Sequence, residues 1–370
     1  MDFNTKELQR AIAKLKGLVN TKSPYPAIRG IFYADGVMCA TDMNVHAKVT
    51  VSTGLIPTDE KFIIPYIAFD AIGKLSADVT TITADARNNV TVSCGKFNTT
   101  FASVSGADFP LLDPSDNPDV SAEIDFNAFT KALNGVSYAC SVDEKKGALV
   151  GVNMTANGGA LSMVALDGFR AATSHMSISD MRSFAATVPE GFWRVLAKIS
   201  SGENKVEFCV GEGGKSLSIK GEEFAVVTRT LDGAFPDVAK IIKATSPDKQ
   251  IIVSKDDILH ALDLHSAALK DSGANNLIVL TADPGTSAVT FTARNEASSF
   301  SFEIPAECNG FDELFRIGFN SKYLLDAIKG LADAEDVRLF CKSPVTGALI
   351  QDADRPDDTC GLVLPVRLNG

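Results

Sequence analysis

The sequence contains no apolar run of about 18 residues, which excludes an ordinary transmembrane helix. Residues 1–18, MDFNTKELQRAIAKLKGL, also lack the continuous apolar region and small-residue cleavage site of a secretory signal peptide. Hydrophobic residues make up 45% and charged residues 22% of the 370 positions, values typical of folded globular proteins and not of disordered chains. We therefore expect a cytoplasmic protein of two or three domains.

Cysteine and histidine motifs are missing as well. The seven cysteines are dispersed, the closest pair stands 19 residues apart, and no CxxC motif occurs. An odd, scattered set excludes a disulfide framework and a cysteine zinc site, and it indicates reduced thiols in a cytosolic core. His260 and His265 lie five residues apart on an expected helix, not the four that would suit a metal pair. No metal site is predicted.

Signatures of nucleotide binding and catalysis are also absent. There is no Walker A sequence and no GxGxxG motif between a strand and a helix. The stretch Gly211–Lys215 is interpreted as a β-turn, because the alternating segment Leu217–Ile219 follows it instead of a helix. The acidic stretch Asp352–Asp358 is interpreted as a solvated loop around Arg355 and Pro356, with a cation site as the alternative. These absences disfavour an enzyme, and no cofactor is expected.

Basic residues are outnumbered by acidic ones. The chain has 35 Lys and Arg against 46 Asp and Glu, a net charge of −11. This balance argues against a protein that coats nucleic acid with its whole surface. It leaves open a protein that keeps its basic residues on one face and its acidic residues elsewhere.

What the sequence does contain is an internal repeat. Residues 65–76 align without gaps on residues 189–200 at an offset of 124, and a third copy follows at an offset of 256 from the first. A second helical pattern, L-x-x-A-I at residues 8–12, recurs at residues 129–133 and again 129 positions further on. Two different elements in the same order three times make chance similarity a poor explanation.

The repeats predict an α+β protein of three tandem units, each with two helices and antiparallel β-structure. Short β-rich runs lie between and after the two helices of each unit. The boundaries fall near residues 121 and 248, beside the polar stretches DPSDNPD and SPDK. The expected domains are therefore residues 1–121, 122–247 and 248–370.

Basic side chains recur on the faces of the predicted helices that lie opposite the apolar stripe. In the first helix, Lys6, Arg10 and Lys14 are spaced four residues apart. In the second unit, Arg194 and Lys198 follow the same rule. For one helix, solvated lysines are a sufficient explanation. Their repetition in an acidic chain favours a segregated positive surface that holds a phosphate backbone without reading base sequence.

Four segments carry a family resemblance. ALDGFRAA at residues 165–172, FPDV at 235–238, IGFNSKYLLD at 317–326 and LVLPVRL at 362–368 resemble the bacterial DNA polymerase III beta subunit, the sliding clamp. The resemblance implies three similarly folded clamp domains in each chain. It also implies a head-to-tail homodimer that closes into a ring, with helices around the hole and sheets outside. Such a ring encircles duplex DNA and tethers the polymerase without catalysing a reaction.

The resemblance implies three sets of functional residues. A hydrophobic groove between the second and third domains, where polymerase and clamp-loader peptides dock, maps to Leu149, Leu166, Gly168, Phe169, Arg170, Ala171, Pro236, Lys240, Ile241, Leu362, Val363, Leu364, Pro365, Val366, Arg367 and Leu368. DNA contacts map to Lys6, Arg10, Lys14, Lys22, Lys146, Arg194 and Lys198. The dimer interface maps to Phe109 and Leu111 against Ala268 and Leu269.

The chain also departs from the family pattern. Phe169 and Ala171 stand where a histidine and a larger aliphatic residue are common. Residues 147–148, Gly-Ala, replace a pair of aromatic residues, and residues 369–370 extend past the usual terminal leucine. For residues 362–368, a plain C-terminal strand is the alternative to a groove wall, and alternate residues can serve both roles. Two other function classes stay open: a repeat-built interaction scaffold without DNA binding, and an enzyme with a site near residues 352–358.

Overall fold

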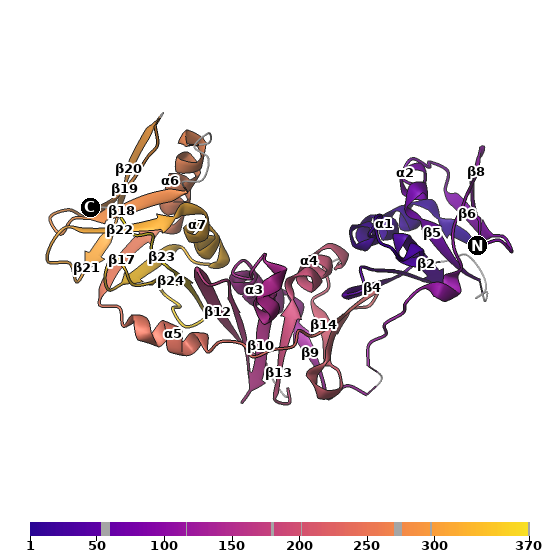
Figure 1. Cartoon of the computed structure of the whole chain (residues 1–370), viewed down its shortest axis with the longest axis horizontal. Helices are drawn as coiled ribbons and strands as arrows, with labels where there is room; N and C mark the ends of the chain where they lie inside the picture. The colour runs from indigo at the N-terminus through magenta and orange to yellow at the C-terminus, as the bar shows by residue number, and fades with distance from the viewer. Residues whose placement is uncertain are drawn as a thin grey trace. The chain divides into compact units, whose positions relative to one another are not determined.

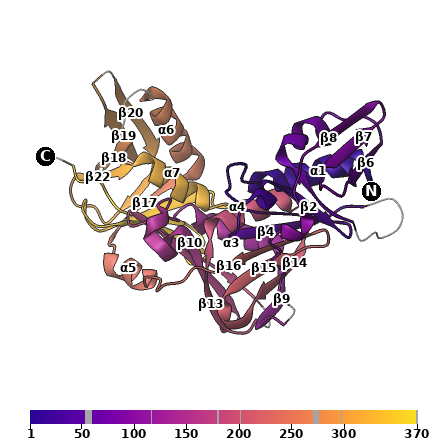
Figure 2. The same ribbon diagram turned by 45° about the vertical axis from the view of Figure 1, so that its right-hand side comes forward.

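The structure is a computed structural model. It describes residues 1–52, 60–115, 117–178, 181–200, 202–269, 276–296 and 298–368. The chain forms two compact units. The first unit combines Met1–Phe126 with Val188–Thr230, and the second combines Asn127–Thr187 with Leu231–Gly370. Figure 1 and Figure 2 label their helices and strands.

The first unit contains two antiparallel sheets. The smaller has four strands in the order β1 (Asp2–Asn4), β6 (Val79–Ala84), β7 (Val90–Cys94) and β8 (Phe97–Phe101). The larger has eight strands in the order β5 (Lys61–Pro65), β2 (Gly30–Ala34), β3 (Val37–Thr41), β4 (Val45–Thr50), β16 (Phe224–Arg229), β15 (Ser216–Lys220), β14 (Lys205–Val210) and β9 (Val120–Asp125). Its two halves join where β4 pairs antiparallel with β16.

Among its described residues, the first unit has three α-helices: α1 (Thr5–Leu15), α2 (Phe69–Ile72) and α4 (Glu190–Ile199). The Asn4 side chain caps α1 by accepting hydrogen bonds from the backbone N–H groups of residues 6 and 7, at 3.0 and 3.2 Å. The apolar stripe of α1, formed by Leu8, Ala11, Ile12 and Leu15, is buried, as a helix on a sheet requires. Helix α1 packs against α4.

The second helix of the first repeat is shorter than its sequence copies predict. Only Phe69–Ile72 is α-helical, and a 3₁₀ turn at Tyr66–Ala68 precedes it. The aligned helices α4 and α7 (Ser321–Gly330) each contain 10 residues. Gly73 stands at the C-cap of α2, and glycine disfavours a continued helix because its backbone loses the most freedom on ordering.

The second unit also contains two antiparallel sheets. Its nine-stranded sheet has the order β13 (Phe184–Pro189), β10 (Gly151–Asn157), β11 (Ala160–Leu166), β12 (Arg170–Ser177), β25 (Thr359–Val363), β24 (Ala348–Asp352), β23 (Asp336–Cys341), β17 (Lys249–Ser254) and β21 (Glu307–Asn309). Its four-stranded sheet has the order β20 (Ser299–Pro305), β19 (Ala288–Arg294), β18 (Leu277–Ala282) and β22 (Phe315–Asn320). In the larger sheet, β12 pairs antiparallel with β25.

Helices α3 (Phe126–Ser137), α5 (Val238–Thr245), α6 (Lys255–Ala268) and α7 complete the set of α-helices in the described residues. Helices α6 and α7 pack on each other, and Ile258, Leu262, Leu324 and Ile328 enter a core cluster with strand residues such as Phe291. The buried face follows from the 3.6-residue period of the apolar positions.

The predicted α+β class is confirmed. The boundaries near residues 121 and 248 stay a prediction, because the two compact units divide the chain differently. The seven cysteines are free thiols, six of them buried and Cys308 half-buried. Among the described residues, no helix combines the length and apolar character needed to span a bilayer.

Candidate functional site

A small apolar cluster forms where strands β11, β12 and β25 meet helix α5. Its buried members are Leu166, Ala171, Val238, Leu349, Cys360 and Leu362. The same elements, and the segment after β25, also carry apolar side chains that face solvent. Phe169 is 57% exposed, and Ile241 and Leu364 are each 42% exposed. We call Phe169, Ile241, Leu364 and Val366, with the cluster beneath them, the candidate partner surface.

A tight turn presents Phe169 on this surface. The Asp167 carboxylate oxygen Oδ1 accepts hydrogen bonds from the backbone N–H groups of Phe169 and Arg170, at 2.8 and 3.0 Å. Gly168 has a φ of +97°, a conformation that residues with a Cβ rarely adopt. Aspartate and glycine at these positions therefore explain why the chain reverses between β11 and β12.

Arg170 links this turn to helix α7. Its Nε lies 3.0 Å from Asp167 Oδ2, and its Nη1 lies 2.6 Å from Asp326 Oδ2 on helix α7. The guanidinium also lies 4.5 Å from the ring centre of Tyr323 and 5.5 Å from that of Tyr138. Arg170 is thus held by two carboxylates and two aromatic rings, and it supports the surface more than it faces solvent.

The aromatic contacts extend from the surface into the core. The Phe169 ring stacks on Tyr323 with centroids 6.2 Å apart. Tyr138, at the inner end, has its pKa raised by burial. At the outer end, Lys146 Nζ lies 5.7 Å from the centre of the Phe169 ring and donates to the Asp167 carbonyl at 2.6 Å. The structure therefore places Lys146, predicted as a DNA contact, beside the candidate partner surface.

The C-terminal segment has buried side chains in a strand and exposed apolar side chains beyond it. Leu362 and Val363 are buried in β25, opposite Ala171 and Arg170 of β12. Beyond the strand, Leu364 N–H donates to the Phe169 carbonyl at 2.9 Å, while its side chain stays partly exposed.

The chain then crosses strand β22. Val366 N–H donates to the Gly318 carbonyl at 2.8 Å. A Cβ at Gly318 would lie 2.9 Å from the backbone carbonyl oxygen of Val366, so this close approach favours glycine. The predicted extension at residues 369–370 lies outside the described residues.

The remaining predicted groove residues surround the cluster. Leu149 is half-buried against it, while Pro236 and Arg367 are exposed. Lys240 Nζ pairs with Asp237 Oδ2 at 3.1 Å, and Asp237 also caps helix α5. The sequence prediction missed two residues, Val238 and Tyr323. The i, i+3, i+4 spacing of Val238, Ile241 and Ile242 is the signal that identifies the apolar face of α5.

The predicted DNA contacts on α1 and α4 lie on two helices that pack together. Lys6, Arg10 and Lys198 are exposed, and Lys14 is half-buried. Arg10 and Lys14 line a cavity of about 60 Å³ that two glutamates, Glu7 and Glu223, also line. Two further predicted contacts are exposed: Arg194, which forms an ion pair with Glu190 on its own helix, and Lys22, in the turn after α1.

The predicted dimer residues differ in exposure. Phe109 is 7% exposed and stacks on Phe32 with centroids 5.0 Å apart, and Leu269 is 8% exposed. Leu111 and Ala268 are exposed. The sheet order shows a feature that residue patterns did not. In the described residues, the outer strands β8 and β20 each pair with a neighbour on one side only.

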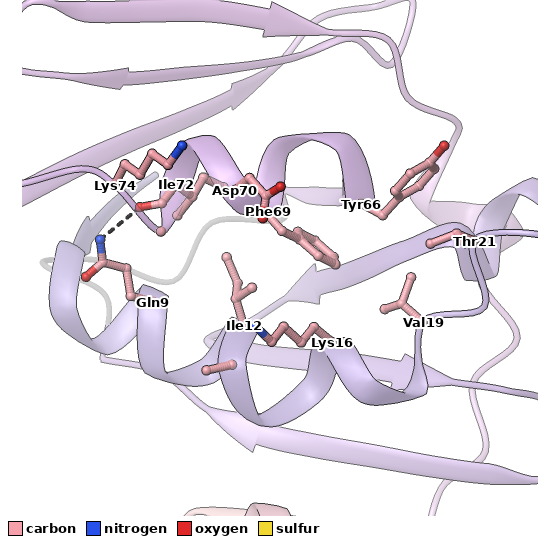
Figure 3. A pocket seen from close by; sticks show the side chains of 12 residues that line it. Gln9, Ile12, Lys16, Val19, Thr21, Tyr66, Phe69, Asp70, Ile72 and Lys74 are labelled. Atoms are coloured by element: carbon pink, nitrogen blue, oxygen red, sulfur yellow. Dashed lines mark hydrogen bonds between the residues drawn. The ribbon is translucent and has the colours of Figure 1, made fainter.

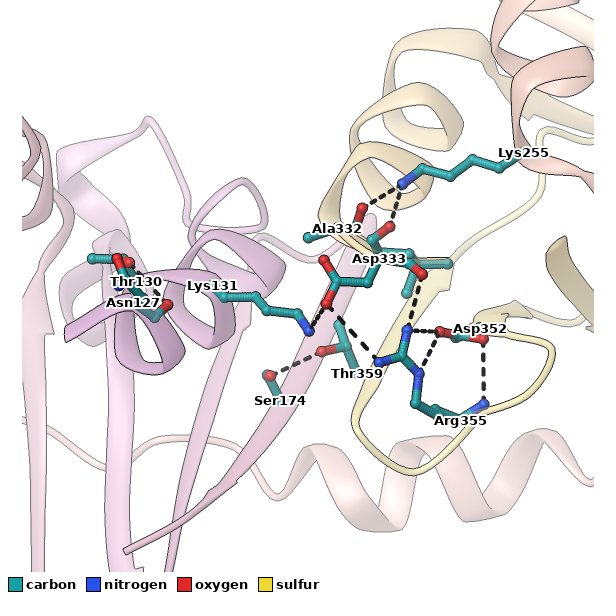
Figure 4. Close-up of polar contacts among 11 residues, drawn as sticks. Asn127, Thr130, Lys131, Ser174, Lys255, Ala332, Asp333, Asp352, Arg355 and Thr359 are labelled. Carbon is teal, nitrogen blue, oxygen red and sulfur yellow. Dashed lines mark hydrogen bonds and ion pairs between the residues drawn. The ribbon is translucent and has the colours of Figure 1, made fainter. Parts of the chain in front are cut away.

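The acidic stretch 352–358 is a turn held by arginine (Figure 4). Asp352 is 8% exposed, not solvated as expected, because Arg355 neutralises it through Nη2–Oδ2 at 2.9 Å. Arg355 Nη2 also donates to the Asp333 carbonyl at 2.9 Å, and the Asp333 side chain pairs with Lys131. In the part of the chain that the structure describes, no group of His, Cys, Asp and Glu side chains suits a metal ion.

Comparisons with known proteins agree on one family. The family model described as the DNA polymerase III beta subunit, central domain, matches residues 123–237, and the C-terminal domain model matches residues 244–367. Together they span more than half of the chain. The beta sliding clamp of Synechococcus elongatus is 27% identical over 307 residues, covering 81% of this chain and 79% of that protein. The Bacillus subtilis beta sliding clamp is 30% identical over 62% of this chain and 60% of that protein.

Solved structures share the fold. DNA polymerase III beta subunit from Thermotoga maritima superposes with a TM-score of 0.87 at 19% identity, covering 100% of this chain and 99% of that one. A Pseudomonas aeruginosa sliding clamp bound to griselimycin has a TM-score of 0.87 at 21% identity, with the same coverage. The two matched domain models and this shared fold lead to one conclusion: the chain belongs to the DNA polymerase III beta subunit family, the bacterial beta sliding clamps.

Proposed function

We propose that this chain works as a DNA sliding clamp, a non-enzymatic processivity factor of the bacterial cytoplasm. A dimeric ring encircles duplex DNA and keeps the polymerase on its template. The observation that carries the proposal is the candidate partner surface. It presents exposed apolar residues on a hydrogen-bonded turn, on helix α5 and after β25, and Phe169, Leu364 and Val366 lie inside the two segments that match clamp domain models. No cofactor takes part in this function.

Ring closure is supported by the sheet order. Strand β4 joins β16, and β12 joins β25, to build the two large sheets. We infer that β8 of one copy meets β20 of a second copy and forms a third joint of the same kind. Residues Phe109 and Leu111 would then lie near Ala268 and Leu269 of the other copy. Because each copy offers both β8 and β20, two copies related by a twofold axis close the ring and leave neither of these two strands unpaired.

Three clamp domains per chain, residues 1–121, 122–247 and 248–370, complete this proposal. Two chains then supply six domains to the ring. The basic residues Lys6, Arg10, Lys14, Lys22, Lys146, Arg194 and Lys198 contact phosphates, and the net charge of −11 keeps DNA from the rest of the surface. Retention depends on topology, so weak contacts that carry no sequence information are sufficient.

The partner peptides of this proposal come from DNA polymerase and the clamp loader. Their apolar side chains cover Phe169, Ile241 and Leu364, which otherwise stay in water. The Pseudomonas aeruginosa clamp bound to griselimycin shows that a protein of this fold binds a ligand. The scaffold alternative shares the peptide surface and lacks the ring, so DNA retention distinguishes the two.

A trapping experiment tests the ring. The full chain is mixed with a linear duplex, both ends are then blocked with biotin and streptavidin, and the complex is washed at high salt. A ring stays on the blocked duplex and leaves when a restriction enzyme cuts it. Single-particle images and the solution mass should show a dimer, twice the 39.2 kDa chain, with a central hole. A monomer without retention would favour the scaffold.

The basic faces are tested in the same assay. Changing Lys6, Arg10, Lys14 and Lys198 to Glu should abolish retention, because the reversed charges repel the phosphates and keep the duplex from entering the ring during mixing. The same change to Gln serves as a control for loss of charge without reversal, and circular dichroism checks the fold. Unchanged retention in the Glu variant would remove these helix faces from the proposed DNA contact.

A further inference from the structure

A cleft between helices α1 and α2 is separate from the candidate partner surface (Figure 3). It encloses about 650 Å³, a size typical of sites for small organic ligands. Its apolar walls come from Ile12, Val19, Phe69 and Ile72, and the ring of Tyr66 stands at one end. Tyr66 is 42% exposed. The cleft therefore offers two aromatic rings to a ligand from solvent.

The rim of the cleft is cationic. Lys16 and Lys74 line it, with Asp70 as the one carboxylate among its lining residues in the described chain. Gln9 Nε2 donates to the carbonyls of Ile72 and Leu75, at 2.8 and 2.9 Å, and ties α1 to the segment after α2. Gln9 therefore links the two elements that form the walls of the cleft.

The third repeat shows what is particular to the first. A smaller cleft of about 260 Å³ lies between α6 and α7, lined at the corresponding positions. Ile12, Lys16 and Val19 correspond there to Leu262, Ser266 and Leu269, and Tyr66 and Phe69 correspond to Lys322 and Leu325. Both repeats have the cleft because they share the fold. The cleft of the first repeat contains two aromatic rings and Lys16, and the cleft of the third repeat does not have them at the corresponding positions.

We propose that the first-repeat cleft binds one nucleotide of single-stranded DNA. The base lies against Tyr66 and Phe69, and the phosphate lies near Lys16. Aromatic stacking tolerates any base, and lysines favour phosphate, so the two features suit this one chemical class. A base within a duplex is covered on both faces, so an unpaired nucleotide is required. The inference rests on the proposed function in one respect: DNA passes along these helix faces.

The test compares two fluorescent strands with the same phosphates. The full chain is titrated with an octamer of thymidylates and with an abasic octamer at one salt concentration, and anisotropy is measured. The wild-type chain should bind the thymidylate strand about tenfold more tightly, as one stacked base contributes. Tyr66→Leu should remove this preference. Tyr25→Leu should keep it, because Tyr25 is 61% exposed and does not line the cleft.

A second pair of variants tests the phosphate. Lys16→Gln should lower the affinity for both strands by the same factor. Lys96 lies in an exposed turn and does not line the cleft, so Lys96→Gln should leave both affinities unchanged. Equal affinity of the wild-type chain for the two strands would overturn the proposal. The same holds if Tyr25→Leu and Tyr66→Leu reduce the preference for the thymidylate strand equally. The trapping assay separates this failure from that of the ring, since Tyr66→Leu should still be retained on the blocked duplex.

Discussion

At the scale of single residues, Arg170 shows how one buried cation shapes an exposed surface. It neutralises Asp167 and Asp326, which lie on different elements, and it stacks on Tyr323, the ring that supports Phe169. The exposed position of Phe169 therefore depends on a side chain that is itself nearly covered. A motif of D-G-x-R identifies the turn, and the partners from α7 complete it.

Arg170→Met should destabilise the protein and lower its affinity for partner peptides. The change leaves two carboxylates without their cation, at a cost of about 2–3 kcal/mol in the free energy of unfolding. Urea unfolding measures this cost, and peptide titration measures the binding. Arg170→Lys is the matched variant, because it keeps the charge and loses the two-pronged geometry. Full stability of the Met variant would show that the carboxylates find other partners.

His46 should make stability depend on pH. Burial lowers the pKa of His46 in the fold from an ordinary 6.5 to about 4, Asp42 opposes this effect, and Arg229 and Lys48 add to it. The unfolded chain therefore binds more protons between these values. The contribution of neutral His46 is complete above pH 6.5 and is lost as the pH falls toward 4, by about 1–2 kcal/mol at pH 5.

Urea unfolding at pH 7 and pH 5 measures this loss. His46 lies opposite Val227 where β4 joins β16, so the loss of stability should be observed in the unfolding of the first unit. Trp193, the single tryptophan, lies on helix α4 of that unit and provides the fluorescence signal. His46→Gln should flatten the pH dependence. An identical slope in the two proteins would assign the effect to other groups.

At the scale of elements, local sequence explains several boundaries. Residues 211–215 were predicted as a turn, and β14 indeed ends at Val210 while β15 begins at Ser216. Asn320 is the N-cap of α7, and its side chain accepts hydrogen bonds from the N–H groups of Lys322 and Tyr323. Helix α2 is shorter than its aligned copy α4, and Gly73 stands at the position where α2 ends.

Truncation after Val363 tests the C-terminal element. The shortened chain should lose at least about tenfold in affinity for a polymerase peptide, because Leu364 and Val366 no longer cover the ligand and burial of each large side chain contributes roughly 1.5–3 kcal/mol. The β12–β25 pairing ends at Val363, so the fold and the dimer should persist. Circular dichroism and solution mass serve as controls. Retained peptide binding would place the partner site elsewhere.

At the scale of the whole molecule, the acidic charge and the ring support each other. A net charge of −11 would oppose binding by an open surface, whereas an encircling ring needs no tight contact. Closure of the ring then becomes the property on which retention depends. The dimer contact is therefore the place where a single substitution should have the largest effect on function.

Leu111→Asp should weaken the dimer. Leu111 is 51% exposed in the chain, and a charge buried in an apolar contact between copies is costly unless it is paired. Analytical ultracentrifugation should show dissociation at a concentration at least about tenfold higher than for the wild-type chain. Val142→Asp is the matched control, because Val142 is 98% exposed and lies outside the proposed contact. Equal dimer stability in both variants would remove Leu111 from the interface.

The repeat, the α+β class and the family all follow from patterns in the amino-acid sequence. Periodic apolar positions and short motifs are local properties, and the resemblance that the motifs carry predicts Leu166, Phe169 and Leu362 as groove residues, which stays a prediction. Contacts between distant segments do not follow from local pattern. The Arg170–Asp326 pair joins residues 156 positions apart, and Lys146, on the segment before β10, reaches the carbonyl of Asp167 in the turn between β11 and β12. Tertiary structure alone decided these contacts, because side chains meet where strands pair and helices pack.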